Sequence, residues 1–427
     1  MLSKALIKVA QLPKVCLKTQ SENKVKQCLL GSSRTLAVDA HTTSNPLGPD
    51  RVLPANSFTS TRPEVPVKLR LGSHPSSAWP PKSVWKMLQE TVARAPHQIA
   101  LTVKREGRWV SWTYAEYEAD IRRVAKAFIK LGLRPHHSVA IMGHNAPEWH
   151  LSNVAAVVAG GIATGVYPTN SSEAVNYVLE HSRADILVVG DSENLAKLSD
   201  TGTKLAAVVQ YEEEHVGPGA VSWRRLLEIG DSVPDSVLFE RLRGQAVNQT
   251  CMLVYTSGTT SKPKGVMISQ DNITWIIRVS QDVFQWKQDQ ESCVSYLPLS
   301  HVAAQVIDIY LTMFGGATVW FADKYALQGS LIETLVEAQP TRFIGVPRVY
   351  EKIADKLQEV AAKGGRSPTT CTLCTTTIAH LLQVVKDNDQ LAEKERTLYL
   401  NLLERPFLER GVRMPRQVGS RIGFQWS

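Results

Sequence analysis

The chain has 427 residues, 43% hydrophobic and 21% charged, the balance of an ordinary globular protein with room for two or three domains or subdomains. Its net charge of +8 is concentrated in residues 1–70, where eleven Lys or Arg face four Asp or Glu and account for +7. The rest of the chain is nearly neutral, so charge gives no support for nucleic-acid binding. Six cysteines are too few for a disulfide framework, and no apolar run reaches the roughly 18 residues of a membrane span.

Residues 1–82 are expected to be a basic N-terminal segment followed by a Pro- and Ser-rich linker, largely disordered. Residues 1–20 hold four lysines and no acid, and their apolar residues recur at helical spacing. That composition is typical of a mitochondrial transit peptide, and a basic tail without targeting is the alternative. We expect an intracellular protein, cytoplasmic or peripheral to the endoplasmic reticulum membrane, unless residues 1–35 direct it to mitochondria. Eight prolines in residues 40–82 indicate the linker.

From residue 83 the pattern becomes globular, and short apolar runs alternate with helical periodicity. Ser83 is a candidate N-cap, Gly132 a helix stop and Asp191 a second N-cap. The alternation and the mostly uninterrupted apolar strand runs predict a parallel α/β sheet covered by helices on both faces. Helices are expected at 83–94, 113–131, from 147 and at 192–198, and strands at 100–103, 109–112, 138–142, 184–189 and 204–209.

The stretch Y-T-S-G-T-T-S-K-P-K-G at 255–265 is rich in hydroxyls and has two lysines and no acid. Apolar strands are predicted on both sides, at 251–255 and 265–269, and a helix capped by Asp271 or Asn272 follows. A strand–loop–strand setting excludes a Walker A loop, which leads into a helix. The hydroxyls, the flexible Gly258 and the point charge of Lys264 nevertheless suit a polyphosphate, and a solvated turn is the alternative.

The order of residues at 255–267 resembles the phosphate loop of the adenylate-forming superfamily, which includes acyl-CoA synthetases, luciferases and peptide-synthetase adenylation domains. One departure is Ser261, where that family usually has Gly. Y-L-P-L-S-H at 296–301 resembles the next core motif, and F-I-G-V-P-R-V-Y-E-K-I at 343–353 resembles long-chain fatty-acid members. S-Q-D-N-I-T-W at 269–275 and S-Y-L-P-L-S-H-V-A-A-Q at 295–305 are most similar to the bubblegum branch.

The resemblance implies the large N-terminal domain of the acyl-CoA synthetase fold, with stacked, mostly parallel sheets and helices. It also implies a two-step reaction with a fatty acid, ATP with Mg²⁺, and coenzyme A. The fatty-acid carboxylate attacks the α-phosphorus of ATP to give acyl-AMP and pyrophosphate, and the coenzyme A thiol then displaces AMP. Because the carboxylate is already a nucleophile at neutral pH, positioning and charge neutralisation carry the first step. A lipid substrate is consistent with peripheral membrane association, and nothing indicates an oligomeric state.

The resemblance assigns residues to three roles and leaves the metal without an assigned protein ligand. Lys264 and His301 are the expected catalytic residues. The alternative to a functional role for His301 is a histidine packed in the core after a strand. The alternative for Arg348 is a residue in an ordinary surface salt bridge. The expected nucleotide-binding residues are Thr256, Ser257, Gly258, Thr259, Thr260, Ser261, Lys262, Pro263 and Lys264. The expected substrate-binding residues are His301, Val346, Pro347 and Arg348.

Two motifs of the superfamily have no counterpart in the sequence. None of the eleven tyrosines is followed by Gly, so the Y-G-x-[ST]-E motif is missing, and no T-G-D-type motif follows 265. The sequence therefore predicts a partial AMP-binding domain over 83–363 and a divergent tail over 364–427, part helical and part disordered, without the small C-terminal domain. Two hypotheses follow: a fatty-acid–CoA ligase, or an inactive truncated isoform that at most binds nucleotide or acyl groups or is regulatory.

Overall fold

The computed structural model describes residues 48–72, 78–198, 204–212, 214–256 and 262–346, together with residues 349 and 352. Its α-helices are α3 (Val84–Arg94), α4 (Tyr114–Lys130), α5 (Pro147–Val158), α6 (Ser172–His181), α7 (Ser192–Ala196), α8 (Trp223–Asp231), α9 (Asp235–Gly244), α10 (Gln270–Val283), α11 (Val302–Ala304), α12 (Thr312–Gly315) and α13 (Leu331–Ala338). A π-helix, η2 (Gln305–Leu311), and a 3₁₀-helix, η3 (Ala326–Gln328), complete the helical elements of these residues.

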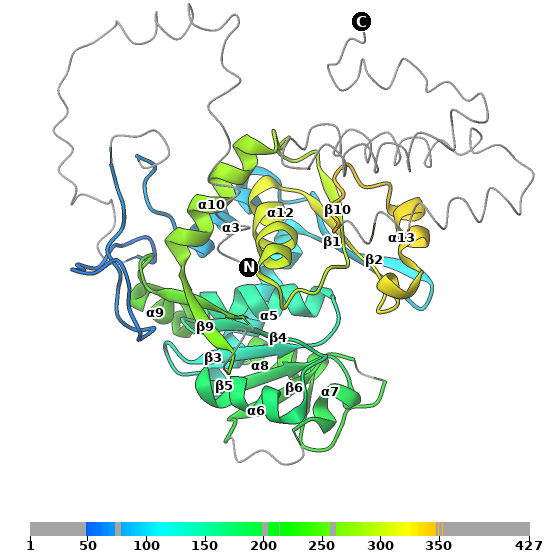
Figure 1. Cartoon of the computed structure of the whole chain (residues 1–427), viewed down its shortest axis with the longest axis horizontal. Coiled ribbons are helices and arrows are strands. Elements are labelled where there is room, and N and C mark those ends of the chain that lie inside the picture. Colours follow the sequence, from blue (N-terminus) through cyan, green and yellow to red (C-terminus); the bar gives the residue numbers. More distant parts are fainter. Residues whose placement is uncertain are drawn as a thin grey trace, which may run out of the picture. The chain divides into compact units, whose positions relative to one another are not determined.

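The strands of the described residues form two sheets (Figure 1). The larger sheet has the order β7-β6-β5-β3-β4-β8-β9 and is parallel except for the antiparallel pair β8·β9. The smaller has the order β10-β11-β1-β2 and is parallel except for β1·β2. The strands are β1 (Ile99–Arg105), β2 (Arg108–Thr113), β3 (Ser138–Met142), β4 (Ile162–Val166), β5 (Ala184–Val189), β6 (Ala207–Gln210), β7 (Val221–Ser222), β8 (Thr250–Thr256), β9 (Lys264–Ser269), β10 (Ser292–Ser295) and β11 (Thr318–Phe321).

Both faces of the larger sheet are buried, as the continuous apolar strands predict. Along β3, Val139 and Ile141 belong to one core cluster together with α4 and α5. Ala140 and Met142 belong to a second cluster, on the α6 side. Because successive side chains of a strand point to opposite faces, the strand has no solvated face, and the predicted doubly covered, mostly parallel α/β sheet is confirmed. No helix among the described residues combines the length and apolar character needed to cross a bilayer.

Most predicted elements are present with bounds close to the predictions, and the starts of α10 and β6 differ. The Ser83 hydroxyl accepts from the Lys86 amide and Asp191 caps α7, as expected. Helix α10, however, begins at Gln270, because Ser269 and Asn272 form a reciprocal capping box, so the expected cap at Asp271 or Asn272 is wrong. Strand β6 begins three residues later than the predicted 204.

Residues 48–72, expected to be linker, lie against the folded domain. The Asn248 side chain makes three hydrogen bonds to this segment, donating to the carbonyls of Leu53 at 2.8 Å and Val67 at 2.9 Å and accepting from the Leu53 amide at 3.0 Å. Arg51 donates to the Gln245 carbonyl at 2.8 Å, and Asp50 accepts from the Ser83 amide at 2.7 Å. The linker interpretation is therefore wrong for 48–72, whose backbone groups are satisfied by distant parts of the domain.

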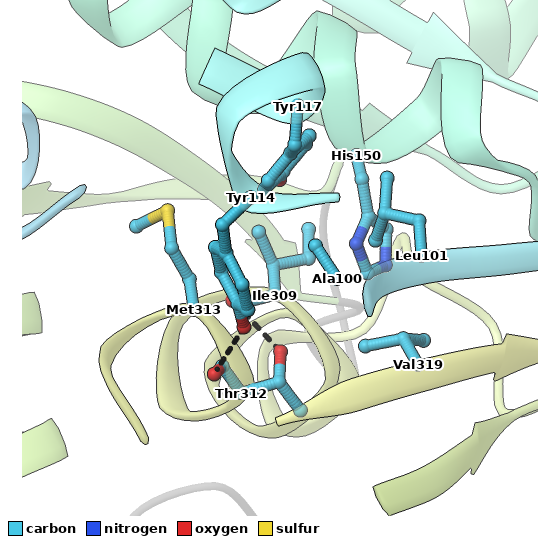
Figure 2. A pocket seen from close by; sticks show the side chains of 9 residues that line it. All are labelled: Ala100, Leu101, Tyr114, Tyr117, His150, Ile309, Thr312, Met313 and Val319. Atoms are coloured by element: carbon cyan, nitrogen blue, oxygen red, sulfur yellow. Dashed lines mark hydrogen bonds between the residues drawn. The ribbon is translucent and has the colours of Figure 1, made fainter. Parts of the chain in front are cut away.

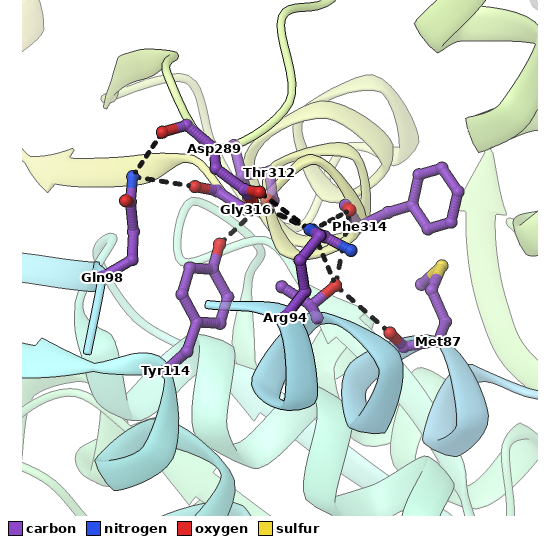
Figure 3. A network of polar contacts seen from close by, with 9 residues as sticks. Met87, Arg94, Gln98, Tyr114, Asp289, Thr312, Phe314 and Gly316 are labelled. Carbon is purple, nitrogen blue, oxygen red and sulfur yellow. Dashed lines mark hydrogen bonds and ion pairs between the residues drawn. The ribbon is translucent and has the colours of Figure 1, made fainter. Parts of the chain in front are cut away.

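A polar network joins the end of α3, Gln98 and Tyr114 to Asp289 and to the residues at the end of α12 (Figure 3). Arg94 pairs with both carboxylate oxygens of Asp289, at 2.8 and 3.0 Å, and Gln98 donates to the carbonyls of Asp289 and Gly316, each at 3.1 Å. The Tyr114 hydroxyl reaches the carbonyls of Thr312 and Ala317. Gly316 is left-handed, with φ of +65°, and a Cβ there would lie 1.8 Å from Asp289 Oδ1. The network thus fixes the far end of the helical stretch that begins at His301.

Candidate active site

The lysine-bearing loop connects the two strands of an antiparallel hairpin, as the sequence predicts. Strands β8 and β9 pair Tyr255 with Gly265 and Thr256 with Lys264. The expected nucleotide-binding residues Ser257, Gly258, Thr259, Thr260 and Ser261 lie outside the described residues. The described ends of the loop are Thr256, which is half-buried, and Lys262, Pro263 and Lys264. Because β8 is parallel to β4, the described ends of the loop lie at the carboxyl edge of the sheet, where open α/β sheets bind their ligands.

The two lysines at the end of the loop differ in their surroundings. The Lys262 ammonium lies 5.1 Å from the centroid of the Tyr177 ring, a cation–π contact. Lys264 opens β9 with an exposed side chain, and the described residues offer its ammonium no hydrogen-bond or ion-pair partner. Lys264 is therefore the loop lysine available to an anionic ligand.

The segment of His301 follows β10 and is held by Asn145, a buried residue just beyond β3. The Asn145 amide donates to the Leu297 carbonyl at 2.8 Å and to the Ser295 hydroxyl at 2.9 Å, and its oxygen accepts from the Leu299 amide at 3.3 Å. His301 itself is exposed and caps α11, with Nδ1 accepting from the Ala303 amide at 3.1 Å. The alternative of a packed histidine does not describe this side chain.

The π-helix η2 begins four residues after His301, and its first side chain, Gln305, is fully buried. The side-chain oxygen Oε1 of Gln305 accepts a hydrogen bond from the Asn153 side chain. The Gln305 Nε2 and the Ser300 hydroxyl have no hydrogen-bond partner among the described residues. Both residues border Gly165 of β4, where a Cβ would lie 2.8 Å from Ser300 Cα and 3.1 Å from Gln305 Nε2. Since β4 pairs with both β3 and β8, Gly165 brings the His301 segment to the edge that carries the hairpin loop.

The third expected segment, 343–348, reaches the same region through Tyr296. The Tyr296 hydroxyl donates to the Ile344 carbonyl at 2.8 Å, and its ring stacks on Phe343 with centroids 5.5 Å apart. Val346 follows with 49% of its side chain exposed, and Pro347 and Arg348 lie outside the described residues. Tyr296, to which the sequence motifs had assigned no role, thus connects the segment of Val346 to the His301 segment.

Two buried acid–base groups lie close to this arrangement. Burial raises the pKa of Asp308 in η2 to about 7, and a hydrogen bond with Ser295 opposes that shift. Burial lowers the pKa of His150 to about 3, so this imidazole is neutral under physiological conditions. Figure 2 shows His150 and Tyr117 among the residues that line a gap too narrow for a water molecule. Neither His150 Nε2 nor the Tyr117 hydroxyl has a partner among the described residues, so we regard the gap as imperfect core packing.

Three possible metal ligands meet at another point of the carboxyl edge. His144, Asp191 and Glu212 follow β3, β5 and β6, and their ligand atoms lie within 4.8 Å of one another. Asp191 is already the N-cap of α7, and Lys324 approaches Glu212 to 3.8 Å. Burial is the main cause that lowers the pKa of His144. The distances permit a cation, but Lys324 already supplies Glu212 with positive charge.

Comparison with known proteins identifies the family. Residues 88–390 match the family described as AMP-binding enzyme. The chain belongs to this family. The match extends past residue 363, where the sequence motifs had placed the domain boundary.

Two fatty-acid ligases are among the curated relatives of this chain. It is 44% identical over 319 residues to long-chain-fatty-acid–CoA ligase ACSBG2 of Gallus gallus, covering 73% of this chain and 42% of that protein. It is 43% identical over 320 residues to ACSBG1 of Homo sapiens, covering 73% and 44%. The resemblance to the bubblegum branch is confirmed, and the chain spans less than half the length of these curated relatives.

Solved structures support the fold. The inhibitor-bound N-terminal domain of FACL13 from Mycobacterium tuberculosis superposes with a TM-score of 0.53 at 19% identity, covering 66% of this chain and 65% of that chain. VinN gives a TM-score of 0.54 at 15% identity, covering 68% and 66%. At these identities the similarity concerns the fold alone.

Proposed function

We propose that this chain contributes the ATP-binding and acyl-binding parts of a long-chain fatty-acid–CoA ligase. The observation that carries the proposal is the combination of 44% identity to such a ligase with an exposed Lys264 that has no partner among the described residues. In the proposed reaction a fatty-acid carboxylate attacks the α-phosphorus of ATP, pyrophosphate leaves, and the coenzyme A thiol then displaces AMP from the acyl-adenylate.

Lys264 is proposed to neutralise the terminal phosphates, a role that suits a point charge on a flexible stem. The Thr256 hydroxyl is proposed to donate to the same phosphates, together with the loop residues 257–261. Mg²⁺ is proposed to arrive with the triphosphate, whose oxygens are the ligands it prefers. Charge neutralisation at a fixed position lowers the barrier because the donors need no reorganisation during the reaction.

His301 and Val346 are proposed to border the acyl-adenylate, with Pro347 and Arg348 continuing the second segment. Support comes from geometry: Tyr296 and Gly165 bring these segments to the edge where the hairpin loop lies. The His301 ring is exposed and its Nδ1 is engaged by the Ala303 amide, so Nε2 is the atom available to a ligand. Association with the membrane surface is proposed from the lipid nature of the substrate.

ATP–pyrophosphate exchange in the presence of palmitate tests the proposal. Lys264→Ala should reduce exchange about 10–100-fold, the value of one to two charge-assisted hydrogen bonds. Lys86→Ala, which removes an exposed lysine on α3, is the matched control and should leave exchange unchanged. Unchanged exchange in Lys264→Ala would refute the role of the loop. ATP binding without exchange would instead support the alternative of a binding fragment.

A further inference from the structure

Helix α6 contacts both arms of the hairpin at the points where the lysine-bearing loop begins and ends. We propose that Tyr177 and His181 are positioning residues that fix these two arms and thereby aim Lys264 at the phosphates. The inference rests on the proposed function of the loop, and its test separates the two. Neither residue belongs to the motifs by which the sequence resembles its family.

On the outgoing arm, the Tyr177 hydroxyl donates to the Pro263 carbonyl at 3.0 Å. Pro263 lies one residue before Lys264, so this bond fixes the backbone from which the lysine side chain departs. The Tyr177 ring also carries the Lys262 ammonium on its face, at 5.1 Å. One aromatic side chain therefore contacts both the Lys262 side chain and the Pro263 backbone, the two residues just before Lys264.

On the incoming arm, His181 Nδ1 and the Tyr255 hydroxyl form a hydrogen bond of 2.8 Å. Tyr255 is buried, with 7% exposed, and sits one residue before Thr256. Its ring occupies the space beside Gly265, where a Cβ would meet Tyr255 Cζ at 3.3 Å. The contact thus fixes the last residues of β8 against the first residues of β9.

Tyr177 and His181 form one unit on a rigid support. They are four residues apart on α6, and their rings stack with centroids 5.3 Å apart and planes inclined by 22°. The opposite face of α6 buries Val175, Val178 and Leu179 in the core of the larger sheet. A helix packed in this way does not move with the loop, so contacts to it restrict both loop ends.

The test compares ATP with AMP as ligands of the purified 427-residue chain. Tyr177→Phe keeps the ring and its cation–π contact but removes the bond to Pro263. It should raise the dissociation constant of ATP·Mg²⁺ about fivefold, the worth of one neutral hydrogen bond. AMP lacks the terminal phosphates, so its affinity should stay within about twofold. Glu180→Gln, an exposed change on the same helix, is the control and should affect neither ligand.

A double-mutant cycle shows whether Tyr177 acts through Lys264. In a Lys264→Ala background, Tyr177→Phe should no longer weaken ATP binding. An equal loss for ATP and AMP, or an undiminished loss without Lys264, would reduce Tyr177 to a general structural role and overturn the inference. If Lys264→Ala weakens ATP binding and Tyr177→Phe does not, the loop function stands and the positioning role falls.

Hydrogen exchange gives a readout that does not depend on ligand. Tyr177→Phe combined with His181→Ala should accelerate amide exchange at least about threefold in a peptide covering residues 252–268, while β3 and β5 stay protected. If the parent chain binds no ATP, the proposed function fails, and this experiment alone decides whether α6 fixes the hairpin arms. Unchanged exchange in the double variant would overturn that contact role as well.

Discussion

Substituting Gly165 by Ala tests whether the His301 segment depends on its close approach to β4. The new Cβ would lie 2.8 Å from Ser300 Cα and 3.3 Å from the Ser300 carbonyl oxygen. Both are backbone atoms and cannot rotate away, and β4 is itself held between β3 and β8. The segment that leads into His301 must therefore shift by a few tenths of an ångström.

The expected loss of stability is moderate because two effects oppose each other. Overpacking of this kind costs about 1–3 kcal/mol, and immovable contact atoms favour the upper half of that range. Removing a glycine from the unfolded chain returns about 0.4–1 kcal/mol. A net destabilisation of about 1–2 kcal/mol should appear as a lower urea midpoint, and palmitate-dependent exchange should fall further because Ser300 and His301 are displaced.

Gly244→Ala is the matched control for this experiment. Gly244 closes α9, and a Cβ there meets nothing within 4 Å. This variant should be neutral or up to about 1 kcal/mol more stable, since only the unfolded state is affected. A Gly165→Ala protein with the urea midpoint and exchange activity of Gly244→Ala would refute the proposed contact between β4 and the His301 segment.

Three further predictions concern the buried residues Asn145 and Asp308 and the N-terminal segment. Asn145→Ala leaves the Leu299 amide and the Leu297 carbonyl without their hydrogen-bond partner. It should therefore lower the free energy of unfolding by about 2–4 kcal/mol in urea titrations, and a loss below about 1 kcal/mol would contradict the supporting role of Asn145. For Asp308, whose pKa is raised to about 7, stability is greatest below its unfolded pKa of about 4 and is lost as pH rises to 7. Asp308→Asn should therefore flatten the fall in urea midpoint between about pH 5 and 7, and an unaltered slope would contradict this. Residues 1–40 fused to a fluorescent reporter should accumulate in mitochondria if they are a transit peptide, and a diffuse cytosolic signal would exclude it.

The parts of the fold that were predictable are those with strong local signals. Strands β3 and β5 have the predicted bounds because each is a short, mostly apolar run closed by turn residues, with Ser138 opening β3 and Asp185 as the one charged residue of β5. The start of α10 was misplaced because Ser269 ends a strand and caps a helix at once. The 48–72 segment was misread because its proline-rich composition indicates a linker, whereas its order comes from Asn248, almost 200 residues away.

The residues of the candidate site also differ in whether the sequence predicts them. Lys264 and His301 lie within long motifs and could be singled out from sequence. Tyr177 and His181 could not, since an ordinary amphipathic helix contains both and their partners lie more than 70 residues further along the chain. The role of Gly165 depends on which segment of backbone packs against β4, and a local sequence pattern cannot predict that contact.

The supports of the site share a chemical feature that bears on which positions of this chain tolerate substitution. Asn145 bonds the carbonyl of Leu297, Tyr177 that of Pro263, and Tyr296 that of Ile344. Each support thus fixes the path of a site segment through its backbone, whatever side chain the segment carries there. The segment residues can change to suit another ligand while the path persists, whereas replacing a support leaves a backbone group without its partner. Substituting the half-buried Leu297 by Met should therefore change stability by less than about 1 kcal/mol, well below the loss expected for Asn145→Ala.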